Sequence, residues 1–582
     1  MKFALVESRD QVVEGASKYE AVFVLEESFD KRDNLISLPA ALNGSDSKFR
    51  NHYLSLLGQH INVERLDQLF GSVSRNLGVR PSEVFSVFEL NIFSRHPELS
   101  DLAKASYVLD VMSEYPNSEL ISFLQVHPHV NDFLGEMLGD GDFRKHVRWP
   151  YEIASRIKRL VLPLVEIAKG QAWLLALLLR SMSSNFMDSS LYLGRNIFFR
   201  PASSTQAKDD VPWGNYWLGL KKIYSFFAEK PITACFQSGF FFDSNGRRVR
   251  PFRVGSSVSL LVSIQWSVAK SLWLRVRFSL EKQFPTRAER AFAKGLSEVY
   301  WRSMTGPSFV QSLWEHHQFS FFFGQAKPKS VFFLCEGQPW ETALVAQGRR
   351  MSPNSYYLGV SHTAIRPWDL RYFRPHSWKL GPVQGGSSAP DFFLVTSQFC
   401  LERLTKFYGE SLKIRLVETL RYESPTPAPA TATTPVITVA TTYSKAENLG
   451  LLSFVEALTK DEKLREMVRV RSHPLRPMNL KVQEFDKKSE FPILTICDST
   501  STVGVELAES GHRFVTIHVG SLPNLSPLSD LKEFGKRFAF PNPQLVQRIR
   551  HAKREFANTG FSYYQRDANW NSWRALITEI KL

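Results

Sequence analysis

The sequence predicts an α/β protein that contains two parallel sheets of the Rossmann type. After residue 435, short apolar segments alternate with helical ones, which is the pattern of a parallel sheet whose strands are connected by helices. The same alternation runs from Ser330 to Phe407. A proline-rich stretch separates the two regions. We therefore expect two α/β domains joined by a linker.

Residues 424–435, with the sequence SPTPAPATATTP, form the predicted linker. Closely spaced prolines among small residues cannot build a core, and they favour an extended chain. This linker defines an N-terminal domain at residues 1–423 and a C-terminal domain at residues 436–582. Within the first domain we predict a helical and aromatic insertion from about residue 47 to about residue 320, which is mostly helical up to about Met182.

The C-terminal domain is predicted to contain four strands and two helices. The strands are expected at residues 436–440, 468–471, 491–497 and 513–517, and the helices at 447–460 and 503–509. In a parallel sheet, ligands bind beyond the carboxyl ends of the strands. His473 and the hydroxyl residues from Ser499 to Thr502 each follow a strand end, so we expect them to converge on one crevice.

The N-terminal domain is predicted to place two polar residues at neighbouring strand ends. Its strands are expected at residues 3–6, 21–25, 330–334, 356–360 and 391–395, with helices ending near 349 and covering 398–407. Glu336 follows one of these strands, and Gly337 permits a close backbone approach there. His362 follows the next strand. These two side chains should face the C-terminal domain.

The hydroxyl run is the clearest local signal for a ligand. Ser499, Thr500, Ser501 and Thr502 lie between a strand and a helix. Free N–H groups and the positive end of the helix dipole bind anions at such a turn, and hydroxyls add further donors. Ser and Thr are also favoured as ordinary N-caps. The residues alone leave both a phosphate site and a simple cap open.

These motifs resemble the donor half of bacterial GT-B glycosyltransferases that use CMP-activated sugars, such as bacterial sialyltransferases and the Kdo transferases of capsule and lipopolysaccharide synthesis. The resemblance covers the predicted C-terminal domain. It implies a GT-B fold, in which two Rossmann-like domains face a cleft. It also implies that His473 and Pro474 contact the cytidine nucleotide, and that the hydroxyl run holds the phosphate. The implied donor-binding set is Arg471, His473, Pro474, Ser499, Thr500, Ser501, Thr502 and Glu506.

A second resemblance concerns Glu336-Gly337-Gln338-Pro339-Trp340-Glu341 and the later pair His362-Thr363. This arrangement resembles a motif of bacterial surface-carbohydrate biosynthesis proteins. It implies that Glu336 is the catalytic base or nucleophile, and that His362 is a base or an acceptor-binding group. Glu341 is a further catalytic candidate, although a Glu in this position also caps helices. Asp369 is a weaker candidate for acceptor contact.

The composition bears on partners and compartment. The net charge is +15, the pI is about 9.5, and aromatic residues make up 13% of the chain. Basic surfaces attract polyanions, and basic-aromatic surfaces occur on proteins that rest on membranes or stack on single-stranded nucleic acid. A large aromatic core under a basic surface explains the same numbers. No segment reaches the roughly 20 apolar residues of a membrane span, so membrane contact would be peripheral. Four scattered cysteines and the absence of a secretion signal indicate the cytoplasm.

Taken together, these features predict a CMP-sugar-dependent glycosyltransferase. The expected donor is a 2-keto-3-deoxy acid sugar, which is Kdo or a nonulosonic acid such as sialic, pseudaminic or legionaminic acid. The expected acceptor is a bacterial surface polysaccharide or a lipid-linked glycan at the inner face of the cytoplasmic membrane. No Asp-x-Asp dyad of the metal-dependent type accompanies the motifs, so we expect neither a metal nor a cofactor beyond the CMP-sugar. A UDP-sugar-dependent GT-B enzyme and a basic nucleic-acid-binding protein are the alternatives, and no nucleic acid partner is expected under the favoured hypothesis.

Overall fold

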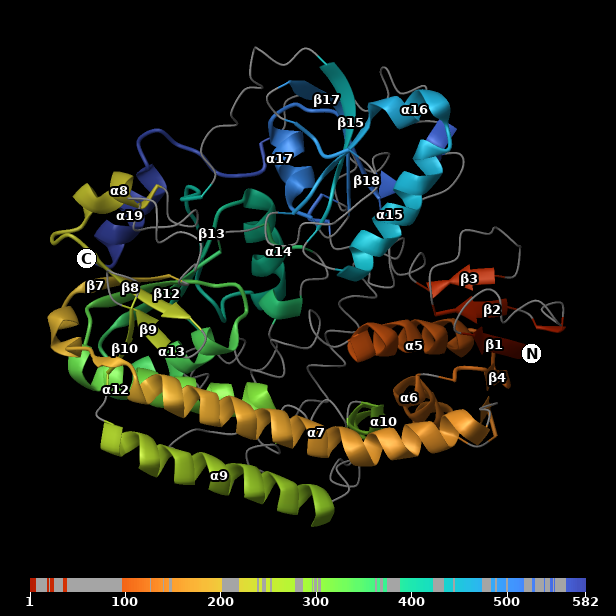
Figure 1. Ribbon diagram of the computed structural model, residues 1–582, viewed down its shortest axis with the longest axis horizontal. Helices are drawn as coiled ribbons and strands as arrows, with labels where there is room; N and C mark the ends of the chain where they lie inside the picture. The colour runs from red at the N-terminus through yellow and green to blue at the C-terminus, as the bar shows by residue number, and fades with distance from the viewer. Residues whose placement is uncertain are drawn as a thin grey trace.

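The computed structural model contains three sheets, each with helices packed against it (Figure 1). It describes residues 1–6, 18–19, 21–25, 35–38, 97–125, 127–139, 141–145, 149–200, 219–237, 240–242, 247–251, 254–277, 286–295, 297, 301, 305–361, 364–366, 370–373, 388–421, 434–442, 445–473, 483–486, 489–498, 501–517, 526–528, 538–539, 545–547, 549 and 562–581.

The N-terminal sheet is fully parallel, with the strand order β3-β2-β1-β4-β5. Its strands are β1 (Lys2–Val6), β2 (Ala21–Val24), β3 (Leu35–Ser37), β4 (Glu119–Ser122) and β5 (Phe143–Lys145). Helices α5 (Pro97–Ser113) and α6 (Pro128–Leu138) pack against each other beside it. Apolar residues on β1 and β2 are buried on both faces, as expected for a parallel sheet that is covered on both sides.

The middle sheet has nine strands in the order β14-β13-β12-β11-β7-β8-β9-β10-β6. Five of its strands form a parallel half: β7 (Asn196–Arg200), β11 (Ser330–Leu334), β12 (Tyr356–Val360), β13 (Phe392–Val395) and β14 (Ile414–Leu416). The other strands are β6 (Asn185–Phe186), β8 (Ile232–Gln237), β9 (Phe240–Phe242) and β10 (Arg248–Arg250). Only β9 runs antiparallel to its neighbours among these strands. Helices α13 (Pro339–Met351) and α14 (Gln398–Tyr408) follow β11 and β13.

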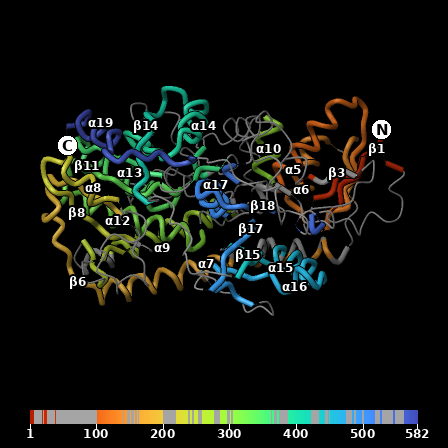
Figure 2. Tube along the Cα trace, turned by 90° about the horizontal axis from the view of Figure 1, so that it is seen from above, coloured from red at the N-terminus to blue at the C-terminus, as the bar shows by residue number. Residues whose placement is uncertain are grey.

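The C-terminal sheet is parallel, with the order β16-β15-β17-β18-β19. Its strands are β15 (Thr434–Ala440), β16 (Val468–Arg471), β17 (Glu490–Asp498), β18 (Phe514–Ile517) and β19 (Phe538–Ala539). Helices α15 (Lys445–Thr459) and α16 (Glu462–Met467) connect β15 to β16, and α17 (Val503–Glu509) connects β17 to β18. Figure 2 shows this sheet between the N-terminal elements and the middle sheet.

A layer of long helices lies under the N-terminal and middle sheets in Figure 1. Helix α7 (Trp149–Met182) runs from the first sheet to the second, and α9 (Val254–Arg277) lies beside it. Both contact α12 (Pro307–Ala326), most of whose apolar side chains are buried. Among the described residues, no helix combines the length and apolarity needed to cross a bilayer.

The chain returns to the middle sheet after leaving the C-terminal one. Helix α19 (Asn571–Glu579) places Trp573, Leu576 and Ile577 against Phe332 and Leu358 of that sheet. The carboxylate of Glu418 accepts hydrogen bonds from the backbone N–H groups of Ser572 and Trp573 at 2.9 and 3.2 Å. These bonds satisfy N–H groups that have no partner within the helix, so one buried carboxylate fixes the start of α19.

The structure confirms the α/β class and the parallel, Rossmann-like sheets. The predicted strands at 330–334, 356–360 and 468–471 and the predicted helix at 503–509 match the observed elements residue for residue. Most of the predicted linker lies outside the described residues, and its last two positions begin β15.

Three expectations about organisation differ from the structure. The described strands β1 to β5, between Lys2 and Lys145, form a sheet of their own, and the region predicted as mostly helical contains β4 and β5. The aromatic runs at 197–200 and 240–242, predicted as part of an insertion, are strands of the middle sheet. Helix α19 belongs to the middle core and not to a C-terminal domain that runs to residue 582. The physical reason is the same in each case, since an apolar segment does not itself specify the surface that buries it.

Candidate functional site at the carboxyl edges of two sheets

The C-terminal sheet has a topological switch point between β15 and β17. The chain passes from β15 to β16 on one side and then crosses to β17 on the other side. Ligands of open α/β sheets bind at the carboxyl edge next to such a reversal. The segments after β15, β16 and β17 contain Thr441, His473 and Ser501, so the topology brings the predicted strand-end residues to one edge.

His473 is held beside the end of β15. Its backbone N–H donates to Thr441 Oγ1 at 2.8 Å, and the Thr441 N–H donates to the carbonyl oxygen of Arg471 at 3.1 Å. Burial lowers the pKa of His473 below its ordinary value. The imidazole is therefore neutral at neutral pH, with one nitrogen that donates and one that accepts. Such a ring can pair with a nucleobase or a ribose hydroxyl.

The turn before α17 is partly capped by its own hydroxyls. The Ser501 N–H donates to the carbonyl oxygen of Asp498 at 3.0 Å, and Ser501 Oγ accepts from the Val503 N–H at 3.3 Å. The Thr502 side chain makes no capping bond. Ser501 thus supplies an ordinary cap, and Thr502 is the described hydroxyl of this turn that does not cap the helix. Pro474, Ser499 and Thr500 lie outside the described residues.

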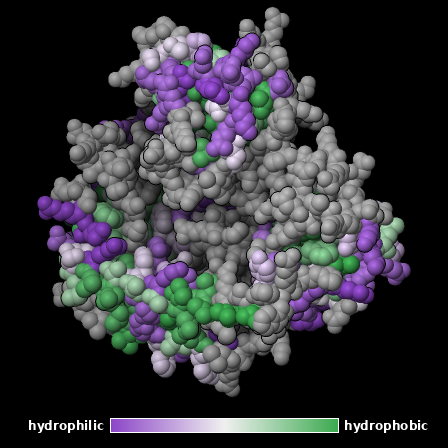
Figure 3. All heavy atoms as spheres, turned by 45° about the vertical axis from the view of Figure 1, so that its right-hand side comes forward, coloured by the Kyte–Doolittle hydropathy of each residue, from purple (hydrophilic) through white to green (hydrophobic). Residues whose placement is uncertain are grey.

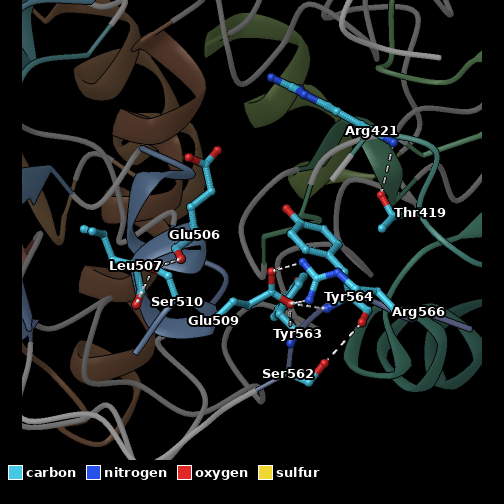
Figure 4. A network of polar contacts seen from close by, with 10 residues as sticks. All are labelled: Thr419, Arg421, Glu506, Leu507, Glu509, Ser510, Ser562, Tyr563, Tyr564 and Arg566. Atoms are coloured by element: carbon cyan, nitrogen blue, oxygen red, sulfur yellow. Dashed lines mark hydrogen bonds and ion pairs between the residues drawn. The ribbon is translucent and has the colours of Figure 1, made fainter. Parts of the chain in front are cut away.

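Glu506 lies in the first turn of α17. Its pKa is shifted by the charges of residues from three parts of the chain. Desolvation by the surrounding protein raises its pKa, the positive charges of Arg421 and Arg471 act in the opposite direction, and the charge of Glu509 raises the pKa further. The side chain nevertheless retains exposed surface. Figure 4 shows Glu506 and Glu509 on the same helix, with Arg421 across the gap on a different part of the chain. Two guanidinium groups therefore act electrostatically on one carboxylate that solvent reaches.

The middle sheet has its own switch point, between β7 and β11. From β7 the chain continues to β8 on one side, whereas β11 and β12 extend the sheet on the other. Glu336 lies two residues after β11 and is therefore at this switch point, as the sequence predicts for a site residue. His362, Thr363 and Asp369 lie outside the described residues, so the structure does not place them relative to Glu336.

Glu341 supports the turn that presents Glu336. Its carboxylate is buried and accepts hydrogen bonds from the backbone N–H groups of Glu336 at 2.8 Å and Gly337 at 3.0 Å. Gly337 has a φ of +77°, and a Cβ at this position would lie 2.7 Å from Arg371 Cβ. Only glycine fits without strain. Of the two roles considered for Glu341, the structure shows the capping one, and the turn is rigid.

A short segment near the C-terminus joins the carboxyl end of the middle sheet to helix α17. The Gln565 N–H donates to the carbonyl oxygen of Thr396, after β13, at 2.7 Å, and the Thr419 N–H donates to the carbonyl oxygen of Gln565 at 3.1 Å. The neighbouring Tyr563 and Tyr564 N–H groups donate to Glu509 Oε1 on α17 at 2.9 and 2.8 Å. The carboxyl end of the middle sheet is thereby tied to the helix that bears Glu506.

In the N-terminal part of the molecule, three described side chains are spaced as metal ligands are. Asp101, His127 and His129 each offer one ligand atom, and these atoms lie within 4.8 Å of one another. Both imidazoles contact Asp101 Oδ2, at 3.1 and 3.2 Å, and the buried Lys104 ammonium lies 3.3 Å from Oδ1. A cation beside the carboxylate disfavours a second one, so we interpret the group as a buried ion cluster. It belongs to the N-terminal sheet and not to the edges described above.

One expectation about metals needs correction. An Asp-Gly-Asp sequence does occur, at residues 140–142. Asp142 precedes β5 and so lies at the amino edge of its sheet, opposite the edge where ligands bind. Asp142 therefore lies apart from the candidate site. Because the chain does contain an Asp-x-Asp sequence, metal independence cannot be argued from the absence of one.

The sequence did not point to Arg421 or Thr441. Arg421 follows β14, just before the proline-rich stretch, and nothing in its local sequence marks it. It became a candidate only because the fold brings it to Glu506. Thr441 follows a predicted strand end in the same way as His473, and that shared position is the signal that would have identified it.

No protein-family model matches this chain, and no curated protein sequence matches it. Among solved structures, the chain is similar to a Methanocaldococcus jannaschii UDP-GlcNAc 2-epimerase in complex with UDP-GlcNAc and UDP (9% identity, 66% of this chain, 99% of that chain, TM-score 0.35). It is also similar to the glycotransferase of kitacinnamycin (12%, 66%, 99%, 0.32) and to spinosyn rhamnosyltransferase SpnG complexed with thymidine diphosphate (10%, 66%, 95%, 0.28). Identities and TM-scores this low assign no activity, substrate or domain arrangement to this chain.

Proposed function

We propose that this chain is a glycosyltransferase of GT-B architecture that transfers a 2-keto-3-deoxy acid sugar from its CMP donor. The observation that supports the proposal most directly is that the charges of Arg471 and Arg421 both act on Glu506, with Arg471 at the end of β16 and Arg421 after the middle sheet. His473 lies two residues after Arg471, beside the end of β15. Two guanidinium groups suit a donor that has one phosphate and one sugar carboxylate.

Each residue has a distinct role in this proposal. The neutral His473 ring binds the cytidine, together with Pro474. Arg471 and the hydroxyls of Ser499, Thr500, Ser501 and Thr502 hold the phosphate and offset the charge that it gains as the sugar departs. Arg421 binds the carboxylate of the sugar. Glu506 orients the two guanidinium groups and limits their net charge.

Glu336 supplies the catalytic carboxylate from the carboxyl edge of the middle sheet. Its turn is held by Glu341 and Gly337, so the backbone that bears the carboxylate keeps a defined position after β11. The carboxylate accepts the proton of the acceptor hydroxyl as a general base, or it attacks the sugar as a nucleophile. His362 assists as a base or binds the acceptor. The phosphate can be held by cationic and hydroxyl groups alone, so the proposal includes no metal and no cofactor.

The acceptor in this proposal is a surface polysaccharide or a lipid-linked glycan at the cytoplasmic face of an anionic membrane. A lipid-linked acceptor is reached most readily by an enzyme that rests on the bilayer. The protein would be peripheral there, and the net charge of +15 would favour its approach to anionic lipid.

A thermal-shift panel tests the donor class. The ligands are CMP, UMP, UDP, dTDP, GDP and a single-stranded oligonucleotide, each measured with the wild type and with His473→Ala and Arg471→Ala. A ligand that binds only the folded state stabilises it by about 2.7 kcal/mol at a concentration of 100 times its Kd. The matched control is His512→Ala, because His512 precedes β18 at the opposite edge of the same sheet.

The expected result is stabilisation by CMP that is lost in the His473 and Arg471 variants and kept in the His512 variant. Glu336→Gln should keep the CMP response and lose CMP release from CMP-Kdo or CMP-nonulosonates in the presence of acceptor. Stabilisation by UDP or dTDP with no response to CMP would contradict the CMP donor and favour the diphosphate alternative. A response to the oligonucleotide alone would favour the nucleic-acid alternative.

A further inference from the structure

Helix α7 carries two groups of exposed apolar side chains on one face. Ile157, Val161 and Leu164 lie in its first half, and Leu175, Leu179 and Met182 lie in its second half. Steps of three and four residues place these side chains on one helical face, and Leu164 keeps 67% of its surface exposed. The other face packs inward through the buried Leu174 and Leu177. Scattered exposed apolar residues are normal, whereas two such groups on one face of a helix indicate a binding surface.

Helix α9 extends this surface with two tryptophans. Trp266 and Trp273 are 55% and 53% exposed, and Val262 lies one turn before Trp266 on the same face. The side chains of Gln265 and Gln171 are hydrogen-bonded, which joins α9 to α7. The two helices lie side by side in Figure 1, and Figure 3 shows apolar residues gathered along the lower part of the molecule. We refer to the exposed residues 157, 161, 164, 175, 179, 182, 262, 266 and 273 as the α7–α9 surface.

The charges on the two helices have one dominant sign. The sequence of α9 contains Lys270, Arg275 and Arg277 and no acidic residue. The sequence of α7 contains five basic and two acidic residues. The Lys270 ammonium lies 5.5 Å from the centre of the Trp266 ring, which keeps a cation at the edge of the apolar face. An apolar face with tryptophans and basic neighbours suits the interface of an anionic bilayer.

A second copy of this chain fits the same surface poorly. In a symmetric dimer a patch meets itself, so the Lys270 side chains at the edge of the two apolar faces would be brought together. Like charges brought together across an interface reduce affinity. Anionic lipid headgroups would instead neutralise these residues while the tryptophans and leucines enter the acyl boundary.

We propose that the α7–α9 surface docks this protein on the surface of an anionic phospholipid bilayer. The proposal deepens the membrane contact of the proposed function by naming the surface that makes it. The two helices lie parallel to the bilayer, with the apolar face inserted and with Lys270 at headgroup level. The candidate site at the carboxyl edges of the sheets lies on a different part of the molecule, so docking leaves it open to a nucleotide.

Flotation of the full chain with phospholipid vesicles tests this proposal. The vesicles contain phosphatidylcholine alone or phosphatidylcholine mixed with phosphatidylglycerol. The variants are Trp266→Ala/Trp273→Ala and Leu164→Asp/Leu175→Asp, and the matched control is Tyr356→Ala, which removes an exposed aromatic side chain from β12. The CMP thermal shift of each variant is recorded in parallel. It reports folding and the donor site without any lipid, so a failure of the donor proposal is distinguishable from a failure of this one.

The expected result is binding of the wild type to the anionic vesicles, reduced at least tenfold in both surface variants and unchanged in Tyr356→Ala. Quenching of tryptophan fluorescence by brominated acyl chains should be lower in Trp266→Phe/Trp273→Phe than in the wild type. The proposal is overturned if the wild type ignores anionic vesicles or if both surface variants bind like the wild type. It is also overturned if light scattering shows a dimer that the variants convert to a monomer without any change in vesicle binding.

Discussion

The carboxylate of Glu509 and the guanidinium of Arg566 form a bidentate ion pair, with N–O distances of 2.7 and 3.3 Å (Figure 4). Glu509 Oε1 also accepts the backbone N–H groups of Tyr563 and Tyr564. Glu509 lies on α17, three residues after Glu506, whereas the segment that contains Arg566 is bonded to the carboxyl end of the middle sheet through Gln565. A single carboxylate therefore fixes the helix of the candidate site against the other sheet.

Replacing Glu509 with glutamine should destabilise the protein and weaken the candidate site together. Hydrogen bonds to a charged group contribute about 1.5–3 kcal/mol, so we expect a loss within that range in urea unfolding and a weaker CMP thermal shift. The matched control is Glu579→Gln, which breaks an exposed pair with Arg415 at 3.3 Å. Exposed pairs contribute about 0–1 kcal/mol. Equal losses in the two variants would argue against the anchoring role of Glu509.

Replacing Glu506 with glutamine should stabilise the protein at neutral pH. Desolvation by the surrounding protein raises the pKa of Glu506, although its side chain keeps exposed surface. Its carboxyl therefore binds a proton more tightly in the folded chain than in the unfolded one. Its ionisation therefore reduces stability as the pH rises above the unfolded value of about 4.3. The variant should have a higher Tm than the wild type at neutral pH and an equal Tm at about pH 4. Glu456→Gln, at an exposed position on α15, serves as the control. A lower Tm at neutral pH would contradict the prediction.

Replacing Gly337 with alanine should disturb the turn that presents Glu336. The added Cβ would lie 2.7 Å from Arg371 Cβ, and the alanine would have to keep the positive φ of Gly337. Strained positions of this kind cost about 1–3 kcal/mol of folding free energy. The control is Gly409→Ala, where φ is also positive but no atom lies within 4 Å of the added Cβ. We expect a larger loss of stability at Gly337, measured by urea unfolding, and a loss of turnover at that position alone. Equal effects would show that the contact with Arg371 is unimportant.

The buried cluster of Asp101, Lys104, His127 and His129 should make the stability of the folded protein depend on pH in the acid range. Burial acts to raise the pKa of Asp101, but hydrogen bonds from His127 and His129 and the charge of Lys104 outweigh it and hold the pKa well below the ordinary value. A lowered pKa gives stability that is fully present above the unfolded value of about 3.9 and is lost as the pH falls below it. Asp101→Asn should lower the Tm at neutral pH, and the difference from the wild type should shrink on acidification. A difference that does not change with pH would point to packing instead of charge.

Chelation tests the expectation that no metal takes part. Treatment with EDTA should leave both the CMP thermal shift and the turnover of the wild type unchanged, since guanidinium and hydroxyl groups hold the phosphate in the proposed function. The same treatment should leave the Tm of the wild type unchanged if Asp101, His127 and His129 form an ion cluster. A fall in Tm that zinc restores, and that is absent in His127→Ala, would instead identify a structural metal site.

Strands with a clear beginning and end were predictable from the sequence. Ser330–Leu334 and Tyr356–Val360 are short apolar runs that are followed by polar or glycine residues, and both match the structure residue for residue. Ile197–Arg200 and Phe240–Phe242 are equally apolar, yet they fall within the insertion that the sequence predicts between about residues 47 and 320. A short apolar run does not distinguish a buried strand from part of a buried helix. Strands of three or four residues, such as β3 and β4, give too little periodicity to reveal the N-terminal sheet.

The candidate site was predictable where chemistry follows a strand end. His473 and Glu336 are predicted in this way. The structure places Glu336 just after β11 at the switch point of the middle sheet, and it holds His473, which follows the edge strand β16, beside the end of β15. Their roles in catalysis and binding stay predictions. Arg421 could not be found, because its role depends on how two sheets approach each other. The sequence could not decide between capping and chemistry for Glu341, since the answer lies in the positions of two backbone N–H groups.

Helix α19 has a consequence for synthesis on the ribosome. Phe332 and Leu358 belong to strands made early, but Trp573 and Leu576, which cover them, are made after the whole C-terminal sheet. The nascent chain therefore carries an apolar sheet face that only earlier residues such as Leu220, Ile223 and Phe227 cover while the later sheet is completed. Such a face is open to aggregation and to chaperones during that interval. The middle sheet is begun before the C-terminal sheet, but its cover is complete only after the C-terminal sheet has been synthesised.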